Sequence, residues 1–168
     1  MPTFEDKRAV PYALADMAAL VGDIAHYPDF VPWLTALRIK RKLKVRGNEV
    51  LYCDVQAGFR AFREQFSCRV TKQTDLSAVT VEYVSGPMSH LDNRWTFRTL
   101  EDGQTEVGFF IEFDFKNAVY RKAVSQVFEK ASLKVLDAFG RRARDEFEPL
   151  PGFSHPVLPG DEQDLTIE

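Results

Sequence analysis

Hydrophobic and polar residues alternate with a period of two over about eighty residues, from Ala36 to Phe115. This alternation predicts strands with one buried face and one exposed face. The clearest example lies between Thr105 and Phe115, where Val107, Phe109, Ile111 and Phe113 share a face. Turn sequences such as Gly47-Asn48 and Asp102-Gly103 separate these segments. Because short links join antiparallel neighbours, the region predicts a meandering antiparallel sheet of about six or seven strands.

The segments before this sheet predict one strand and two short helices. Thr3–Val10 is interpreted as a strand that stops at a proline. Leu14, Met17 and Leu20 then recur at helical spacing. In Tyr27–Leu34 two prolines limit any helix to a short turn and bring large apolar side chains together.

The segment after the sheet predicts one long helix. Asn117 is the expected N-cap, and apolar residues recur at helical spacing to about Glu148. Residues 149–168 contain four prolines and several acidic residues, so we expect an extended or disordered tail. The chain is thus predicted to be an α+β protein with one domain, residues 1–148, followed by that tail.

Composition narrows the function classes. The 168 residues are 45% hydrophobic and 28% charged, which is typical of one globular domain. The net charge is −3, and the tail carries four acidic residues and no Lys or Arg, so the remaining body is near-neutral and argues against a duplex-DNA binder. No apolar run reaches the roughly 20 residues that span a bilayer, and no targeting segment is evident. We therefore expect a soluble, cytoplasmic protein.

Two features of side-chain chemistry stand out. Cys53 and Cys68 lack the spacing of a zinc site or a disulfide framework, so we expect reduced thiols in the core.

Five basic residues alternate along one strand and are predicted to share a face, with Arg41 on the other: Arg38, Lys40, Lys42, Lys44 and Arg46. Three interpretations stay open: protection of an edge strand, contact with an anionic membrane, or contact with ribosomal RNA.

The predicted order of elements implies a cavity. A strongly twisted sheet around one long helix does not close fully against it, and phenylalanine dominates the aromatic residues that would line the gap. The default ligand of such a space is apolar.

The sequence resembles the coenzyme-Q-binding subgroup of the START-like, helix-grip family, which is related to polyketide cyclases and to the bacterial ribosome-association toxin. The resemblance covers nearly all of residues 3–148. It rests on the order and spacing of several short motifs: Tyr27-Pro28-Asp29-Phe30-Val31-Pro32-Trp33, Gly58-Phe59 with Glu64 and Phe66, Gly86-Pro87, Trp95-Thr96-Phe97, Phe113-Asp114-Phe115-Lys116-Asn117, and Ala138-Phe139 with Arg142-Ala143.

This resemblance implies non-enzymatic binding of a hydrophobic ligand, chiefly ubiquinone, by a carrier or chaperone that supports respiratory electron transport. It also allows peripheral contact with the inner face of an anionic membrane. The candidate ligand-binding residues are Phe30, Pro32, Trp33, Phe59, Phe66, Met88, Trp95, Phe97, Phe109, Ile111, Phe113, Val124, Val127 and Phe128. Two alternatives stay open, namely a toxin or regulator that binds a ribosomal subunit and a polyketide cyclase or aromatase.

Little in the sequence indicates catalysis. The three histidines, His26, His90 and His155, are dispersed and match no metal or nucleophile motif. Glu112 and Asp114 could act as acid or base, but they alternate with Phe113 and are predicted to face away from the cavity. We therefore predict no catalytic residue, no metal site and no catalytic cofactor.

Overall fold

The computed structural model describes residues 2–59 and 62–161, which form one antiparallel sheet and three helices. The strands are β1 (Thr3–Val10), β2 (Leu34–Val45), β3 (Asn48–Phe59), β4 (Phe62–Lys72), β5 (Ala78–Ser85), β6 (Met88–Thr99) and β7 (Thr105–Phe115). The helices are α1 (Leu14–Gly22), the 3-10 helix η1 (Ile24–Asp29) and α2 (Ala118–Glu146). The predicted α+β helix-grip class, with two short helices after the first strand, is confirmed.

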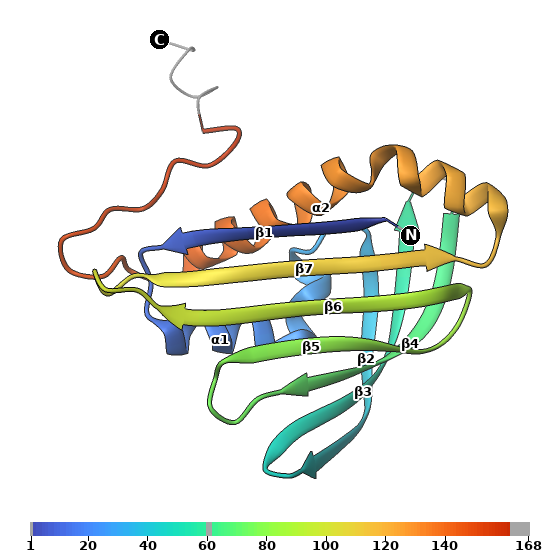
Figure 1. Ribbon diagram of the computed structural model, residues 1–168, viewed down its shortest axis with the longest axis horizontal. Coiled ribbons are helices and arrows are strands. Elements are labelled where there is room, and N and C mark those ends of the chain that lie inside the picture. Colours follow the sequence, from blue (N-terminus) through green and yellow to red (C-terminus); the bar gives the residue numbers. More distant parts are fainter. Residues whose placement is uncertain (1, 60–61, 162–168) are drawn as a thin grey trace.

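The first strand of the chain lies beside the last. The order across the sheet is β1-β7-β6-β5-β4-β3-β2, and Thr3 of β1 is opposite Glu112 of β7. β1, β7 and β6 run along the length of α2, whereas β2, β3 and β4 turn away steeply (Figure 1). This twist makes one face of the sheet concave, and both α-helices pack on that inner face.

The inner face carries the hydrophobic residues, as the alternation predicts. Trp95 and Phe97 of β6 and Val107 and Phe109 of β7 are all buried. They form one core with α1, η1 and the second half of α2. The charged residues of the same strands lie on the outer face.

Strand β2 contains a β-bulge that its sequence does not reveal. Ile39 lies opposite Cys53, but Arg41 lies opposite Tyr52, so Lys40 is an extra residue in the ladder. One extra residue reverses the face to which every later side chain points.

The bulge makes the prediction of one five-residue basic face wrong. Lys40 Nζ lies 3.2 Å from the Asp54 carboxylate on the outer face, whereas Lys42 is opposite the buried Leu51 and projects from the inner face. Arg46 lies beyond the strand, with a φ of 54°. The outer face thus carries Arg38, Lys40 and Arg41, and the inner face carries Lys42 and Lys44.

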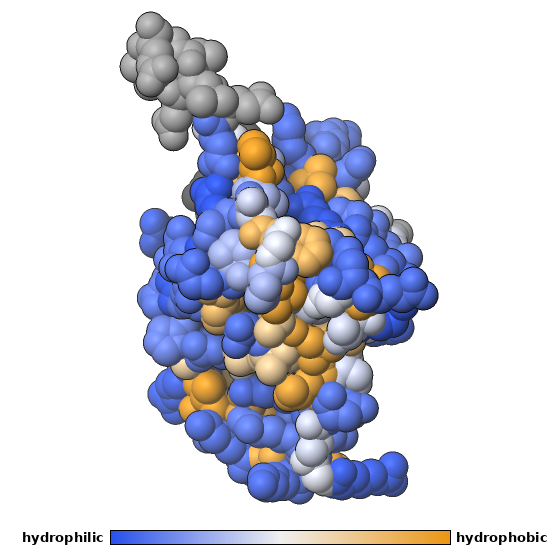
Figure 2. All heavy atoms as spheres, turned by 90° about the vertical axis from the view of Figure 1, so that its left-hand side faces the viewer, coloured by the Kyte–Doolittle hydropathy of each residue, from blue (hydrophilic) through white to orange (hydrophobic). Residues whose placement is uncertain are grey.

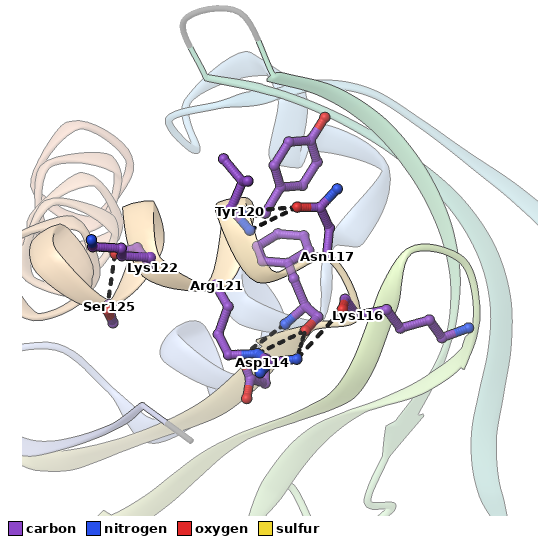
Figure 3. A network of polar contacts seen from close by, with 9 residues as sticks. Asp114, Lys116, Asn117, Tyr120, Arg121, Lys122 and Ser125 are labelled. Carbon is purple, nitrogen blue, oxygen red and sulfur yellow. Dashed lines mark hydrogen bonds and ion pairs between the residues drawn. The ribbon is translucent and has the colours of Figure 1, made fainter.

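Helix α2 begins at the predicted cap. The Asn117 side chain accepts hydrogen bonds from the backbone N–H groups of Val119 and Tyr120, at 2.8 and 3.2 Å (Figure 3). The Arg121 guanidinium donates to the Phe115 carbonyl oxygen at 3.3 Å. These contacts fix the helix start to the end of β7.

After α2 the chain packs back onto the body without regular secondary structure. Leu158 is only 8% exposed and lies against Gly140 of α2. Arg144 donates to the Asp161 carboxylate at 2.6 Å. Hydrophobic residues form a band on this end of the molecule, bordered by hydrophilic ones (Figure 2). The rest of the predicted tail lies outside the described residues.

Candidate ligand-binding cavity

Two adjoining cavities lie between the inner face and α2 in the described part of the chain, each with a volume of about 220 Å³. The central chamber is enclosed by η1, the segment leading into β2, strands β2 to β7 and the second half of α2. The end chamber lies between β7 and the first half of α2. Five residues line both chambers: Trp33, Ala57, Phe109, Ile111 and Val135. The two chambers therefore adjoin each other and share part of their walls.

Trp33 stands at the junction of the chambers in a strained backbone conformation. Its φ is 69°, in the left-handed region that costs an L-residue about 1 kcal/mol or more. Its carbonyl oxygen accepts a hydrogen bond of 2.8 Å from the Gly58 N–H. This bond holds the tryptophan segment against β3, where the two chambers meet.

The chamber walls are almost wholly apolar. Among the described lining residues there is no Asp, Glu, His, Lys or Arg. Tyr27 uses its hydroxyl to donate to the Val21 carbonyl oxygen, and burial raises its pKa, so the phenol stays neutral. Asn93 and Ser132 are the other side chains with oxygen or amide nitrogen atoms in the described walls.

Cys53 and Cys68 are free and buried, as predicted. They lie directly opposite each other on β3 and β4, and Cys68 lines the central chamber. The hydrogen bond to Cys53 and burial both raise the pKa of the Cys68 thiol. A thiol with a raised pKa is a weak nucleophile, so this residue acts as an apolar part of the wall.

The loop between β5 and β6 closes one side of the cavity. Gly86 has a φ of 138°, and a Cβ there would lie 2.7 Å from the Phe66 Cβ. Only glycine allows this approach to a residue that lines the central chamber. Lys116 ties the loop to the start of α2, because its N–H donates to the Pro87 carbonyl oxygen at 3.0 Å.

Most of the candidate ligand-binding residues surround this cavity. Those that line the chambers are Pro32, Trp33, Phe66, Met88, Trp95, Phe109, Ile111, Phe113, Val124, Val127 and Phe128. Phe30 instead packs on Phe139 with a centroid distance of 4.9 Å, and Phe97 is buried in the core away from the chambers. The Phe59 side chain lies outside the described part of the structure. Contact of these residues with a ligand stays a prediction.

Several lining residues were not identified from the sequence. They are mainly smaller apolar residues of β2 to β6 and of α2: Leu34, Leu37, Val55, Ala57, Val70, Val81, Leu91, Ala131, Val135 and Phe139. Asn93 and Ser132 were also missed. Asn93 has the same strand parity as Trp95, so alternation alone could have placed it on the inner face.

The acidic residues considered for catalysis face away from the cavity, as their parity predicts. Glu112 contacts the His90 Nε2 atom at 2.9 Å, and Asp114 lies 3.5 Å from the Arg121 Nε atom (Figure 3). Neither carboxylate is part of the described chamber walls. An acid or base mechanism in the cavity therefore cannot use them.

The three histidines lie at three separate places. His26 pairs with Asp23 at 2.8 Å, and His155 bonds the Tyr12 hydroxyl at 2.9 Å. His90 is on the outer face of β6. Among the described helices, none is both long enough and apolar enough to cross a membrane.

When the chain is compared with known protein families, one family model matches most of it. The model of the polyketide cyclase/dehydrase and lipid transport family matches residues 10–140. The ribosome association toxin RatA of Rickettsia prowazekii is 30% identical over 148 residues, which is 86% of this chain and 98% of that toxin. The mitochondrial coenzyme Q-binding protein COQ10 of Saccharomyces cerevisiae is 29% identical over 143 residues, covering 82% of this chain and 68% of that protein.

Solved structures share the fold. The solution structure of an 18 kDa protein from Caulobacter crescentus has a TM-score of 0.71 and 32% sequence identity, covering 86% of this chain and 97% of that one. The Zhui aromatase/cyclase from Streptomyces sp. R1128 has a TM-score of 0.70 but only 16% identity, covering 85% and 93% of the two chains. This second likeness concerns the fold alone.

Proposed function

We propose, from the premise that this chain belongs to the polyketide cyclase/dehydrase and lipid transport family, that it binds a polyprenylated quinone of the ubiquinone type without chemically changing it. The observation that carries the proposal is the pair of adjoining chambers with almost wholly apolar walls. The name of the related yeast protein supports a quinone as the ligand. The protein would act as a carrier that shields the quinone from water.

The size of the cavity suits part of such a ligand. Two chambers of about 220 Å³ each together reach the lower part of the range of ligand pockets, roughly 300–1,000 Å³. A substituted quinone ring and the first isoprene units fill that space. Because each Å² of apolar surface removed from water contributes about 25 cal/mol, burial of a few hundred Å² supports binding. The rest of a long tail would extend outside the two chambers.

Native mass spectrometry tests this proposal on protein purified gently from a host that makes ubiquinone. We expect a bound species with the mass of a polyprenyl quinone, and organic extraction should release the same compound. The ultraviolet spectrum of the extract before and after borohydride reduction identifies the quinone ring. Protein that carries only fatty acid or phospholipid, or that binds no added ubiquinone, would contradict the proposal.

Association with ribosomal subunits is a second candidate function. It is favoured by the name of the Rickettsia relative and by the exposed outer-face cluster Arg38, Lys40 and Arg41. Clustered basic side chains attract the phosphates of RNA, and the attraction falls as salt rises.

The bulge in β2 offers a matched control for this second candidate. We expect the wild-type chain to sediment with ribosomal subunits at low salt, and the double variant Arg38→Glu, Arg41→Glu to remain at the top of the gradient. The variant Lys42→Glu, Lys44→Glu makes the same change in charge on the inner face and should sediment normally. Equal loss in both variants would indicate a nonspecific charge effect, and a wild-type chain that never sediments would exclude the function.

A cyclase or aromatase activity is less favoured by the cavity. Such an enzyme needs an acid or base beside its substrate, and the described walls offer only neutral side chains. The shared fold of the Streptomyces enzyme carries no activity to this chain, because one fold supports many functions.

A further inference from the structure

The cavity contains two polar side chains with unused hydrogen-bonding capacity. The Asn93 amide nitrogen donates one hydrogen bond, to the Phe110 carbonyl oxygen at 2.9 Å. Its second N–H and its amide oxygen have no partner among the described residues. Ser132 is only 5% exposed and lines the end chamber, and its hydroxyl has no hydrogen bond to another described side chain or loop.

An apolar ligand would affect the hydrogen bonding of Ser132 and of Asn93 differently. The Ser132 hydroxyl can turn back and bond to the helix carbonyl four residues earlier, so a passing hydrocarbon need not leave it unsatisfied. Asn93 is on a strand and has no such alternative, because its amide is already oriented by the Phe110 carbonyl. A hydrocarbon packed on Asn93 would therefore bury polar atoms without hydrogen bonds, which disfavours its binding.

The position of Asn93 also defines an orientation. It lies on β6 two residues before Trp95, in the central chamber, whereas Met88 and Val127 belong to the end chamber. Val127 is 36% exposed, so the wall of the end chamber reaches the surface of the molecule at α2. A ligand whose head binds Asn93 and whose tail reaches the end chamber passes Trp33, which lines both chambers.

We propose that Asn93 is the polar anchor of the cavity and selects ligands whose head carries a carbonyl or a hydroxyl group over pure hydrocarbons. This inference rests on the proposed function and adds to it the position at which the polar head of the ligand binds. The amide offers both an N–H donor and a carbonyl acceptor. It therefore serves the carbonyl of a quinone and the hydroxyl of the corresponding quinol, and both redox forms should bind with similar affinity.

The test compares two probes in the same variant. Ubiquinone with two isoprene units has the head, and squalene is an isoprenoid hydrocarbon without it. In Asn93→Leu, which keeps the branched shape of the side chain and removes its polar atoms, we expect ubiquinone affinity to fall about tenfold, the effect of one lost hydrogen bond of roughly 1.4 kcal/mol. Squalene affinity should be unchanged or higher. Because both probes meet the same protein, any loss of stability from the broken bond to Phe110 affects them equally.

The matched control is Ser132→Ala, which removes a hydroxyl from the end chamber and should change ubiquinone affinity less than twofold. Equal weakening of both probes in Asn93→Leu, or no weakening of either, would overturn the role of Asn93 while leaving quinone binding intact. A wild-type protein that binds neither probe would instead refute the proposed function itself. A clear preference for the quinone over the quinol would show that only the N–H group is used, and would overturn the two-way anchor.

Discussion

Phe113→Glu is expected to fold and to lose its quinone. Phe113 lines the end chamber, where its ring packs against Phe115 and Phe128 at centroid distances of 5.7 and 4.9 Å. It is only partly buried, so a carboxylate there keeps some contact with water and the fold tolerates it. A ligand tail in the chamber would strip that water away, at a cost of several kcal/mol. We therefore expect at least about a hundredfold loss of affinity for ubiquinone, measured by titration and by the bound mass in native spectra.

Phe110→Glu is the control for this prediction. Phe110 is on the same strand but on the outer face, where the Arg94 guanidinium lies 5.0 Å from its ring. A carboxylate there meets a basic partner and leaves the chambers untouched. This variant should keep wild-type affinity. If folded Phe113→Glu retained its quinone, or if both variants lost it equally, the ligand would not occupy the end chamber.

Phe139→Ala is expected to cause the largest loss of stability. Phe139 is 3% exposed, and its ring packs on Tyr27, Phe30 and Trp95 at centroid distances of 5.3, 4.9 and 4.5 Å. It thereby joins α2 to η1 and to β6. Removal of a buried aromatic ring costs about 3–5 kcal/mol, because contacts are lost and a void remains. Urea unfolding of the ligand-free protein, followed by circular dichroism, measures this change in the free energy of unfolding.

Val119→Ala is the matched control on the same helix. Val119 is 70% exposed, so its truncation should change the free energy of unfolding by less than about 0.5 kcal/mol. A cost below about 1 kcal/mol for Phe139→Ala would contradict the packing of α2 on the sheet. Similar costs for both variants would show that the loss does not come from the aromatic cluster, because replacement of valine or phenylalanine by alanine improves helix propensity at both positions.

The fold was predictable because its signals are local. Alternation identified the faces of β6 and β7, so that Glu112 and Asp114 were correctly placed opposite Phe113. The Asn117 side chain marked the start of α2 because a cap acts within three residues. The β-bulge in β2 has no comparable local pattern in the sequence. Four basic residues of β2 recur at every second position from Arg38 to Lys44, and only the register against β3 reveals the extra residue at Lys40.

The apolar character of the cavity could be predicted from the sequence, but the exact set of its lining residues could not. Phe97 has the correct face and chemistry, yet the curvature of the sheet places it in the solid core. Conversely, Ala57 is a small residue that gains importance only because both chambers meet beside it. The composition of the C-terminal segment favoured an extended or disordered tail and did not indicate that Leu158 would be buried against Gly140. Each of these outcomes depends on contacts between residues distant in the sequence.

The pairing of β1 with β7 determines when the cavity can first exist. The Thr3 hydroxyl donates a hydrogen bond to Glu112, which lies 109 positions later in the sequence. During synthesis, β1 therefore has no partner strand until β7 has been made. Contacts this distant slow folding, although the entropy of closing the loop grows only slowly with its length. The walls also require α2, which comes last among the regular elements. The inner face is therefore not covered until α2 has been made, and until then its hydrophobic residues are exposed to aggregation.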